Sequence, residues 1–73
     1  MDEKYAISEV IKEYNFAKEK FCNFASTHEG YAVLLEEVDE LWDEIKKNGS
    51  KDRLTKEAIQ VAAMSIRFLI DCC

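Results

Sequence analysis

The chain contains no proline and only two glycines among its 73 residues. Strands in a compact β protein are joined by tight turns, and these turns depend on glycine and proline. A chain with so few turn residues has few places at which to reverse direction, which favours a small number of long helices. The sequence therefore predicts an all-α fold in which residues 1–73 form a single helical domain.

Three helical segments follow from the spacing of the apolar residues. The first is predicted over about residues 3–23, where apolar side chains recur every three or four positions: Ile7, Val10, Ile11, Tyr14, Ala17 and Phe21. The second carries a similar stripe, which is expected to pack in the core: Tyr31, Leu34, Leu35, Val38, Leu41, Trp42 and Ile45. The third, from about residue 50 onwards, is apolar on most sides between Ala58 and Ile70.

The second and third segments also carry signals at their ends. Ser26 followed by Glu29 has the pattern of a capping box, which predicts the start of the second helix. Asn48-Gly49 predicts its end, because both residue types tolerate the backbone conformation that closes a helix. Either Ser50 or Asp52 can cap the third helix, and the sequence leaves these two open.

The third segment predicts self-association. A helix that is apolar around most of its circumference has to be surrounded, and two short amphipathic helices cannot cover it. A chain of this length also buries only about 60% of the surface that its unfolded form exposes, so its own core is small. We therefore expect an oligomeric helical bundle that a second copy of the chain completes.

The net charge of -5 limits the partners that the chain is expected to bind. An acidic chain without a basic stripe repels nucleic-acid phosphates, so no nucleic-acid binding is expected. No apolar run is long enough to span a membrane, and the charged start Met1–Lys4 lacks the apolar part of a signal peptide.

The three cysteines, Cys22, Cys72 and Cys73, have no disulfide or metal-binding spacing, which favours reduced thiols and a cytoplasmic protein.

The second segment has a strongly acidic side. Its carboxylates are Glu29, Glu36, Glu37, Asp39, Glu40, Asp43 and Glu44. Helical projection places Glu36, Glu40 and Glu44 opposite the apolar stripe, with Glu37 at the edge. Like charges three or four residues apart repel, and a hard divalent cation such as magnesium would relieve that repulsion. Two interpretations remain open at this point, a magnesium site and an ordinary solvated helix face.

The third segment has one narrow polar strip: Glu57, Gln60, Arg67 and Asp71. The strip either faces water, or it places Glu57 and Gln60 across a cleft from the acids of the second segment. Arg67 is expected to form a surface ion pair with Asp71, four residues further on, in preference to a phosphate contact. His28, the only histidine, is expected to be a plain helix-start residue.

These residues carry a resemblance to a known family. The segment Leu35–Leu41 looks like the Glu-Glu-x-x-Glu element of the MazG-like, all-α nucleoside triphosphate pyrophosphohydrolases. That family has Glu-x-x-Asp one helix later, and Glu57–Gln60 stands in the matching place. The flanking segments His28–Val33 and Ala58–Met64 are similar to a small branch of the family found in phage and bacterial genomes. The resemblance covers roughly residues 20–71 of the chain.

The resemblance implies a MazG-like bundle that assembles as a homodimer or homotetramer. It implies hydrolysis of a nucleoside triphosphate to a monophosphate and pyrophosphate, with Mg²⁺ as cofactor. The implied magnesium ligands are Glu37, Glu40, Glu57 and Gln60, and the implied catalytic residues are Glu36 and Glu37. Gln60 departs from the family pattern, because an amide brings no charge and cannot act as a base. The alternative function is a non-catalytic oligomeric helical module for protein association or nucleotide sensing.

Overall fold

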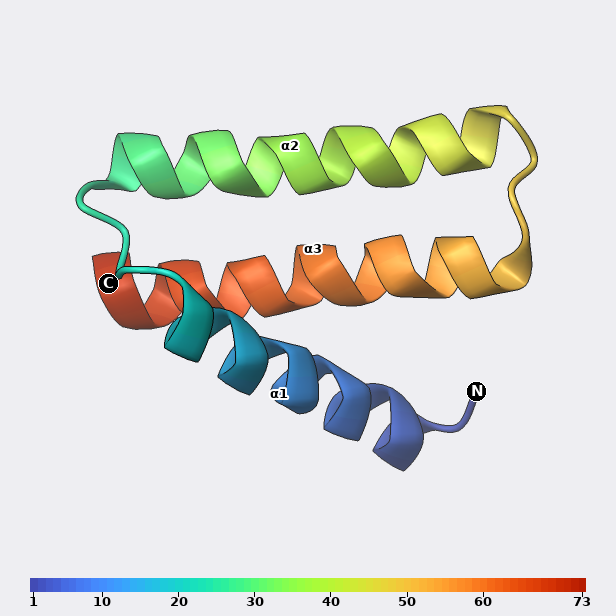
Figure 1. Cartoon of the computed structure of the whole chain (residues 1–73), viewed down its shortest axis with the longest axis horizontal. Coiled ribbons are helices and arrows are strands. Elements are labelled where there is room, and N and C mark those ends of the chain that lie inside the picture. Colours follow the sequence, from blue (N-terminus) through green and yellow to red (C-terminus); the bar gives the residue numbers. More distant parts are fainter.

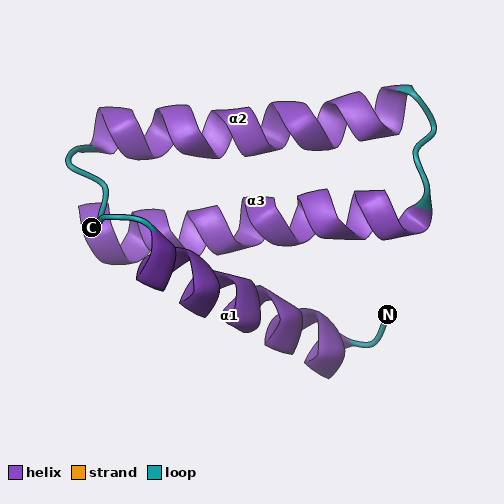
Figure 2. Cartoon of the chain, in the orientation of Figure 1, coloured by secondary structure: helices purple, strands orange, loops and turns teal.

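The computed structural model describes all residues from 1 to 73 and consists of three helices joined by two short loops (Figures 1 and 2). The helices are α1 (Glu3–Lys20), α2 (Thr27–Lys46) and α3 (Lys51–Cys72). The chain has no strand, which confirms the all-α prediction. None of the three helices combines the length and the apolar character that crossing a membrane requires.

Helix α2 begins and ends at the predicted signals, with small differences in detail. The Ser26 Oγ accepts a hydrogen bond from the Glu29 backbone N–H at 3.1 Å. The Glu29 carboxylate accepts from the Ala25 N–H at 3.0 Å, one residue before the cap rather than at the cap itself. At the other end Asn48, and not the glycine after it, adopts the left-handed conformation, with φ of 54°.

The structure also shows where α3 begins and where α1 ends. Ser50, rather than Asp52, caps α3, because its Oγ accepts a hydrogen bond from the Arg53 N–H at 3.2 Å. Helix α1 ends at Lys20, three residues before the predicted limit of 23. The reason is the extended backbone of Phe21, with φ of -120° and ψ of 151°, which starts the loop into α2.

Helices α2 and α3 lie side by side in opposite directions, and α1 packs on α3 alone (Figure 1). No Cα atom of α1 comes within 8 Å of a Cα atom of α2. The C-terminal half of α1 lies close to the end of α3, and the helix diverges from α3 towards the N-terminus (Figure 1). Helix α1 therefore leaves α2 without a second helix packed against it.

The core is small and lies where α1, α3 and the start of α2 meet. Its buried residues are Ala17, Phe24, Ala63 and Met64, with Tyr14, Val33, Leu34, Phe68 and Cys72 packed around them. Only 6 of the 73 residues are buried, so most of the apolar surface of the single chain remains in contact with solvent.

The prediction that Tyr31 and Trp42 pack in the core of the chain is wrong. Their exposed fractions are 61% and 54%, whereas Leu34 and Leu41 from the same stripe are half-buried. The stripe is wider than the contact that α3 makes with α2, and α1 lies too far away to cover the rest. The exposed part of the stripe therefore forms a separate surface.

Candidate metal centre

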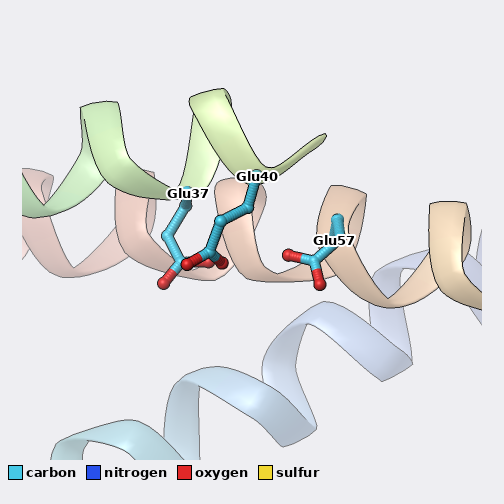
Figure 3. Close-up of side chains that lie close together, drawn as sticks. All are labelled: Glu37, Glu40 and Glu57. Atoms are coloured by element: carbon cyan, nitrogen blue, oxygen red, sulfur yellow. The ribbon is translucent and has the colours of Figure 1, made fainter. Parts of the chain in front are cut away.

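Three carboxylates from two helices converge near the middle of the α2–α3 pair. Glu37 and Glu40 extend from α2, and Glu57 extends from α3 towards them (Figure 3). One carboxylate oxygen from each residue lies within 4.8 Å of the corresponding oxygens of the other two. Glu37 and Glu40 are three residues apart and share one side of α2, and the antiparallel return of α3 places Glu57 beside them. The structure thus brings together three of the four ligands that the resemblance implied.

The electrostatics of these carboxylates favour a bound cation. Burial raises the pKa of Glu37 to about 7, with smaller contributions from the negative charge of Glu40 and a hydrogen bond with it. Burial also raises the pKa of Glu57, and the charge of Glu40 adds to this effect. The Glu57 Oε2 atom is buried and has no hydrogen-bond partner. A buried oxygen without a partner is costly, and a cation at this point would remove that cost.

A cleft of about 310 Å³ between α1 and α3 gives access to these carboxylates. It is lined by Glu13, Phe16, Lys20, Phe21, Glu37, Glu40, Lys56, Glu57 and Gln60. The cleft contains two ammonium groups, on Lys20 and Lys56, beside the carboxylates. It therefore offers oxygen ligands for a hard cation and positive charge for an anionic ligand.

Gln60 is held by a residue that the sequence analysis did not select. The Gln60 Nε2 donates a hydrogen bond to the Glu13 carboxylate of α1 at 2.6 Å. With the amide nitrogen used in this way, the amide oxygen is the atom that remains free to bind a cation. Glu13 adds a fourth carboxylate to the cleft and is the only one from α1. No sequence pattern connects two residues that lie 47 positions apart, so this contact appears only in the folded chain.

Glu36 lies outside the group of three carboxylates. It is exposed and lines a neighbouring cleft of about 340 Å³. The residues lining this second cleft are Glu13, Ala17, Phe21, Cys22, Phe24, Glu29, Val33, Glu36, Glu37, Gln60, Met64 and Arg67. Glu13, Phe21, Glu37 and Gln60 line both clefts, so the two spaces adjoin. Glu36 is thus next to the group of three carboxylates, in a cleft with a mixed polar and apolar lining.

The predicted surface ion pair between Arg67 and Asp71 is wrong. Arg67 is only 5% exposed, and its guanidinium donates a hydrogen bond to the Cys22 carbonyl at 2.8 Å and stacks 4.2 Å from the Phe24 ring centre. Asp71 accepts a hydrogen bond from the Phe24 N–H at 3.0 Å. Both side chains bind the α1–α2 loop, because this loop passes over the C-terminal part of α3. They hold that loop, and so the wall of the second cleft, against α3.

The histidine lies outside both clefts, whereas one of the cysteines, Cys22, lines the second cleft. His28 is exposed and lines neither cleft, as expected for a helix-start residue. Cys22, Cys72 and Cys73 are all free in the structure.

Comparison of the chain with protein-family models, with curated proteins and with solved structures finds no match in any of the three. Function therefore has to be inferred from the residues of the clefts themselves.

Proposed function

We propose that this chain is a MazG-like, magnesium-dependent pyrophosphohydrolase that converts a nucleoside triphosphate to a monophosphate and pyrophosphate. The observation that supports the proposal is the convergence of Glu37, Glu40 and Glu57 in a cleft that also contains Lys20 and Lys56. Carboxylate oxygens are the ligands that magnesium prefers, and enzymes acting on triphosphates use this ion together with basic side chains.

The residues present fit a magnesium ion. Glu37, Glu40 and Glu57 would hold it through carboxylate oxygens, and the buried Oε2 of Glu57, which has no hydrogen-bond partner, supports a cation at this point. Gln60 would add its amide oxygen, which its hydrogen bond to Glu13 leaves free. When bound, the ion would supply positive charge to the triphosphate and make a water molecule more acidic.

The other residues of the two clefts would orient the substrate. Lys20 and Lys56 would contact the phosphate chain, and the second cleft, where Phe21 and Phe24 lie beside polar side chains, would receive the nucleoside. Water attacks phosphorus, the bond between the α and β phosphates breaks, and pyrophosphate leaves. Glu37, which lines both clefts, or Glu36, which lines the second cleft, would accept the proton of the attacking water.

The proposal includes assembly as a homo-oligomer and a cytoplasmic location. The large exposed apolar surface of the single chain supports assembly. Three free thiols and a nucleotide substrate suit the reducing interior of a cell.

The test is pyrophosphate release from a panel of ribonucleoside and deoxyribonucleoside triphosphates in the presence of magnesium. We expect Glu40→Gln and Glu57→Gln to reduce turnover of the best substrate by at least about 100-fold, since each removes a charged ligand. Glu19→Gln, an exposed carboxylate on α1 outside both clefts, is the matched control and should keep full activity. Folded wild-type protein that releases no pyrophosphate from any of these nucleotides would refute the proposal.

One observation favours the second candidate, a non-catalytic module that senses nucleotides. Gln60 brings an amide in place of the family's aspartate, and this amide is bound to Glu13. A site with one charge fewer can still bind a magnesium–nucleotide complex while activating water poorly. Calorimetry distinguishes the two functions, because a sensor binds the nucleotide with magnesium and leaves it intact, whereas an enzyme returns monophosphate.

A further inference from the structure

The second cleft contains a buried positive charge that no carboxylate of the chain neutralises. Arg67 lines this cleft, is only 5% exposed and takes part in none of the three ion pairs of the chain. Its guanidinium donates to the Cys22 carbonyl at 2.8 Å and makes a longer contact of 3.7 Å with the Met64 sulfur. A buried charge without an opposite charge is costly, so a ligand that supplies acceptor atoms to Arg67 would be bound favourably.

Holding the loop between α1 and α2 does not account for the charge of Arg67. Two carboxylates already bind this loop. Asp71 accepts a hydrogen bond from the Phe24 N–H at 3.0 Å. Glu29 accepts one from the Ala25 N–H, also at 3.0 Å. A further tie to the loop needs a single N–H donor, which a neutral amide side chain could supply. The other N–H groups of the guanidinium have no partner in the protein and are free for a ligand.

Aromatic rings fix the orientation of the guanidinium. It stacks 4.2 Å from the centre of the Phe24 ring and lies 5.9 Å from the centre of the Phe21 ring. Stacking leaves the N–H groups free at the edge of the guanidinium plane, where they can donate to two neighbouring acceptors. Phe21 is 54% exposed and lines the same cleft, so its ring offers a surface on which a flat ligand can stack.

The two ends of the second cleft suit the two ends of a nucleotide. Glu37 and Gln60 lie at the end that adjoins the candidate metal centre. Arg67 follows Gln60 on α3 by two helical turns, which is about 10 Å along the helix axis. The inference drawn from this distance rests on the proposed function, which places the phosphates near the metal centre and the nucleoside in the second cleft. The base of such a nucleotide would extend towards Arg67.

We propose that the second cleft selects guanine and that Arg67 is the residue that determines this preference. Guanine presents two neighbouring acceptors, O6 and N7, and their pairing with arginine is the commonest specific contact between a side chain and a base. Adenine has an amino group in place of O6, and this donor would meet the donors of Arg67. Guanine also has donors on its N1 and 2-amino nitrogens. The Glu29 oxygen that Ala25 does not use is available in the same cleft to accept from them.

The first experiment titrates the wild-type chain with nucleoside monophosphates without magnesium, so that binding is measured apart from hydrolysis. Guanosine monophosphate should bind at least about 10-fold more tightly than the adenosine, cytidine and uridine monophosphates. The 7-deaza analogue, which lacks the N7 acceptor, should bind about 10-fold more weakly than guanosine monophosphate. In nitrogen-15 NMR spectra guanosine monophosphate should shift the Nε–H signal of Arg67. The signal of Arg53, the only other arginine and an exposed one, should stay in place.

Several results of this titration would overturn the proposal. Equal affinity for the four bases, or tightest binding of cytidine monophosphate, would contradict a guanine site. An unchanged Arg67 signal would show that the base binds elsewhere. Pyrophosphate that shifts this signal as strongly as guanosine monophosphate does would assign Arg67 to the phosphates instead of the base.

The second experiment replaces the guanidinium by a cation that lacks its two-pronged donor geometry. Arg67→Lys should weaken guanosine monophosphate binding by at least about 10-fold and leave adenosine monophosphate binding unchanged. Arg53→Lys is the matched control and should keep the guanine preference. A folded Arg67→Lys protein with full guanine preference would show that Arg67 only holds the loop. If circular dichroism shows that Arg67→Lys is unfolded, the titrations of the wild type decide the matter.

Pyrophosphate release separates this inference from the proposed function. With magnesium, the guanine triphosphates should be hydrolysed at least about 10-fold more efficiently than the others, in parallel with binding. Equal hydrolysis of all four bases would refute the guanine preference and leave the proposed reaction intact. Guanine-selective binding without any pyrophosphate release would support the preference and refute the hydrolase.

Discussion

Glu37 is the residue whose protonation should most affect the stability of the metal-free protein. Its pKa rises from an ordinary 4.5 to about 7, mainly through burial and then through the charge of Glu40. The folded state therefore holds this proton more tightly than the unfolded state. The resulting stabilisation is complete below about pH 4.5 and is lost as the pH rises through about 7.

We predict that the Tm of the metal-free protein is higher at pH 5 than at pH 8, by on the order of 5 °C. Glu37→Gln should remove most of this difference, because a neutral amide cannot lose a proton. Glu19→Gln, which changes an exposed carboxylate, should keep it. Calorimetric melts with a chelator, at one protein concentration, provide the measurement. An unchanged pH dependence in the Glu37→Gln protein would show that another group is responsible.

The contact between Glu13 and Gln60 makes a second prediction at the level of single residues. Glu13→Gln should lower magnesium affinity about 10-fold, because it removes a negative charge next to the candidate ligands and replaces the charged acceptor of the Gln60 amide by a neutral, weaker one. Gln60→Asp alone should destabilise the metal-free protein, since it places two carboxylates in direct contact. The double variant, Glu13→Gln with Gln60→Asp, restores a hydrogen bond with donor and acceptor exchanged.

Titration calorimetry with magnesium checks this series. The double variant should bind magnesium at least as tightly as the wild type, because it moves the carboxylate to the position where the resembling family has aspartate. Equal affinity of the wild type and the Glu13→Gln protein would mean that Glu13 merely supports Gln60 in the fold. Glu9→Gln, one turn earlier on the same helix, controls for the loss of a charge from α1.

The sequence predicted some residue-level features and missed others for a clear reason. The family resemblance implied Glu37, Glu40 and Glu57 as ligands, and the antiparallel packing of α2 and α3 brings these three side chains together. The contact from Glu13 and the burial of Arg67 were missed, since both depend on how α1 and the loop after it cross α3. Periodicity shows which side of a helix is polar, but the angle at which two helices cross is set by packing.

Among the elements, the start of α2 is the clearest case in which close packing outweighs helix propensity. Replacing a glycine inside a helix by alanine normally stabilises it by up to about 1 kcal/mol. At Gly30 the added Cβ would lie 2.8 Å from the Phe68 ring and 3.1 Å from the Phe24 ring. Forcing an extra carbon into a packed site costs about 1–3 kcal/mol, which exceeds the gain.

We therefore predict that Gly30→Ala destabilises the protein by about 1 kcal/mol and lowers Tm by roughly 5 °C. Urea unfolding at a fixed protein concentration measures the free energy. Ala32→Gly, two residues further along at an exposed position, should cost about 1 kcal/mol through propensity alone. A more stable Gly30→Ala protein would show that α2 and α3 can separate slightly at little cost.

The limits of the helices were predicted well because they depend on neighbouring residues. Ser26, Ser50 and Asn48 act within a few positions of themselves, so their effect can be identified without knowledge of the fold. Which residues of the apolar stripe on α2 are exposed and which are half-buried could not be predicted in the same way. Tyr31 and Leu34 have the same apolar character, and only the position of α3 decides that one is exposed and the other half-buried.

On the scale of the whole molecule, α1 is the least firmly attached helix. Its contact with α3 is smaller than the contact that α2 makes with α3, and its one buried residue is Ala17, in the half of the helix that precedes the loop. Helices with few tertiary contacts open more often than those in a core, and amide hydrogen exchange reports such opening. We expect residues 3–13 to exchange faster than the middle of α2 or α3.

Magnesium should reduce that difference, because the candidate centre includes a residue of α1. Glu13 reaches Gln60 at 2.6 Å and lines the same cleft as Glu37, Glu40 and Glu57. If the ion binds there, each opening of α1 removes a favourable charge from the centre, so binding and closure of α1 stabilise each other. Hydrogen-exchange mass spectrometry should therefore show that magnesium slows exchange in α1 of the wild type and has a much smaller effect in the Glu13→Gln protein. Equal slowing in both proteins would mean that magnesium stabilises the chain without engaging α1, and that the centre is formed by α2 and α3 alone.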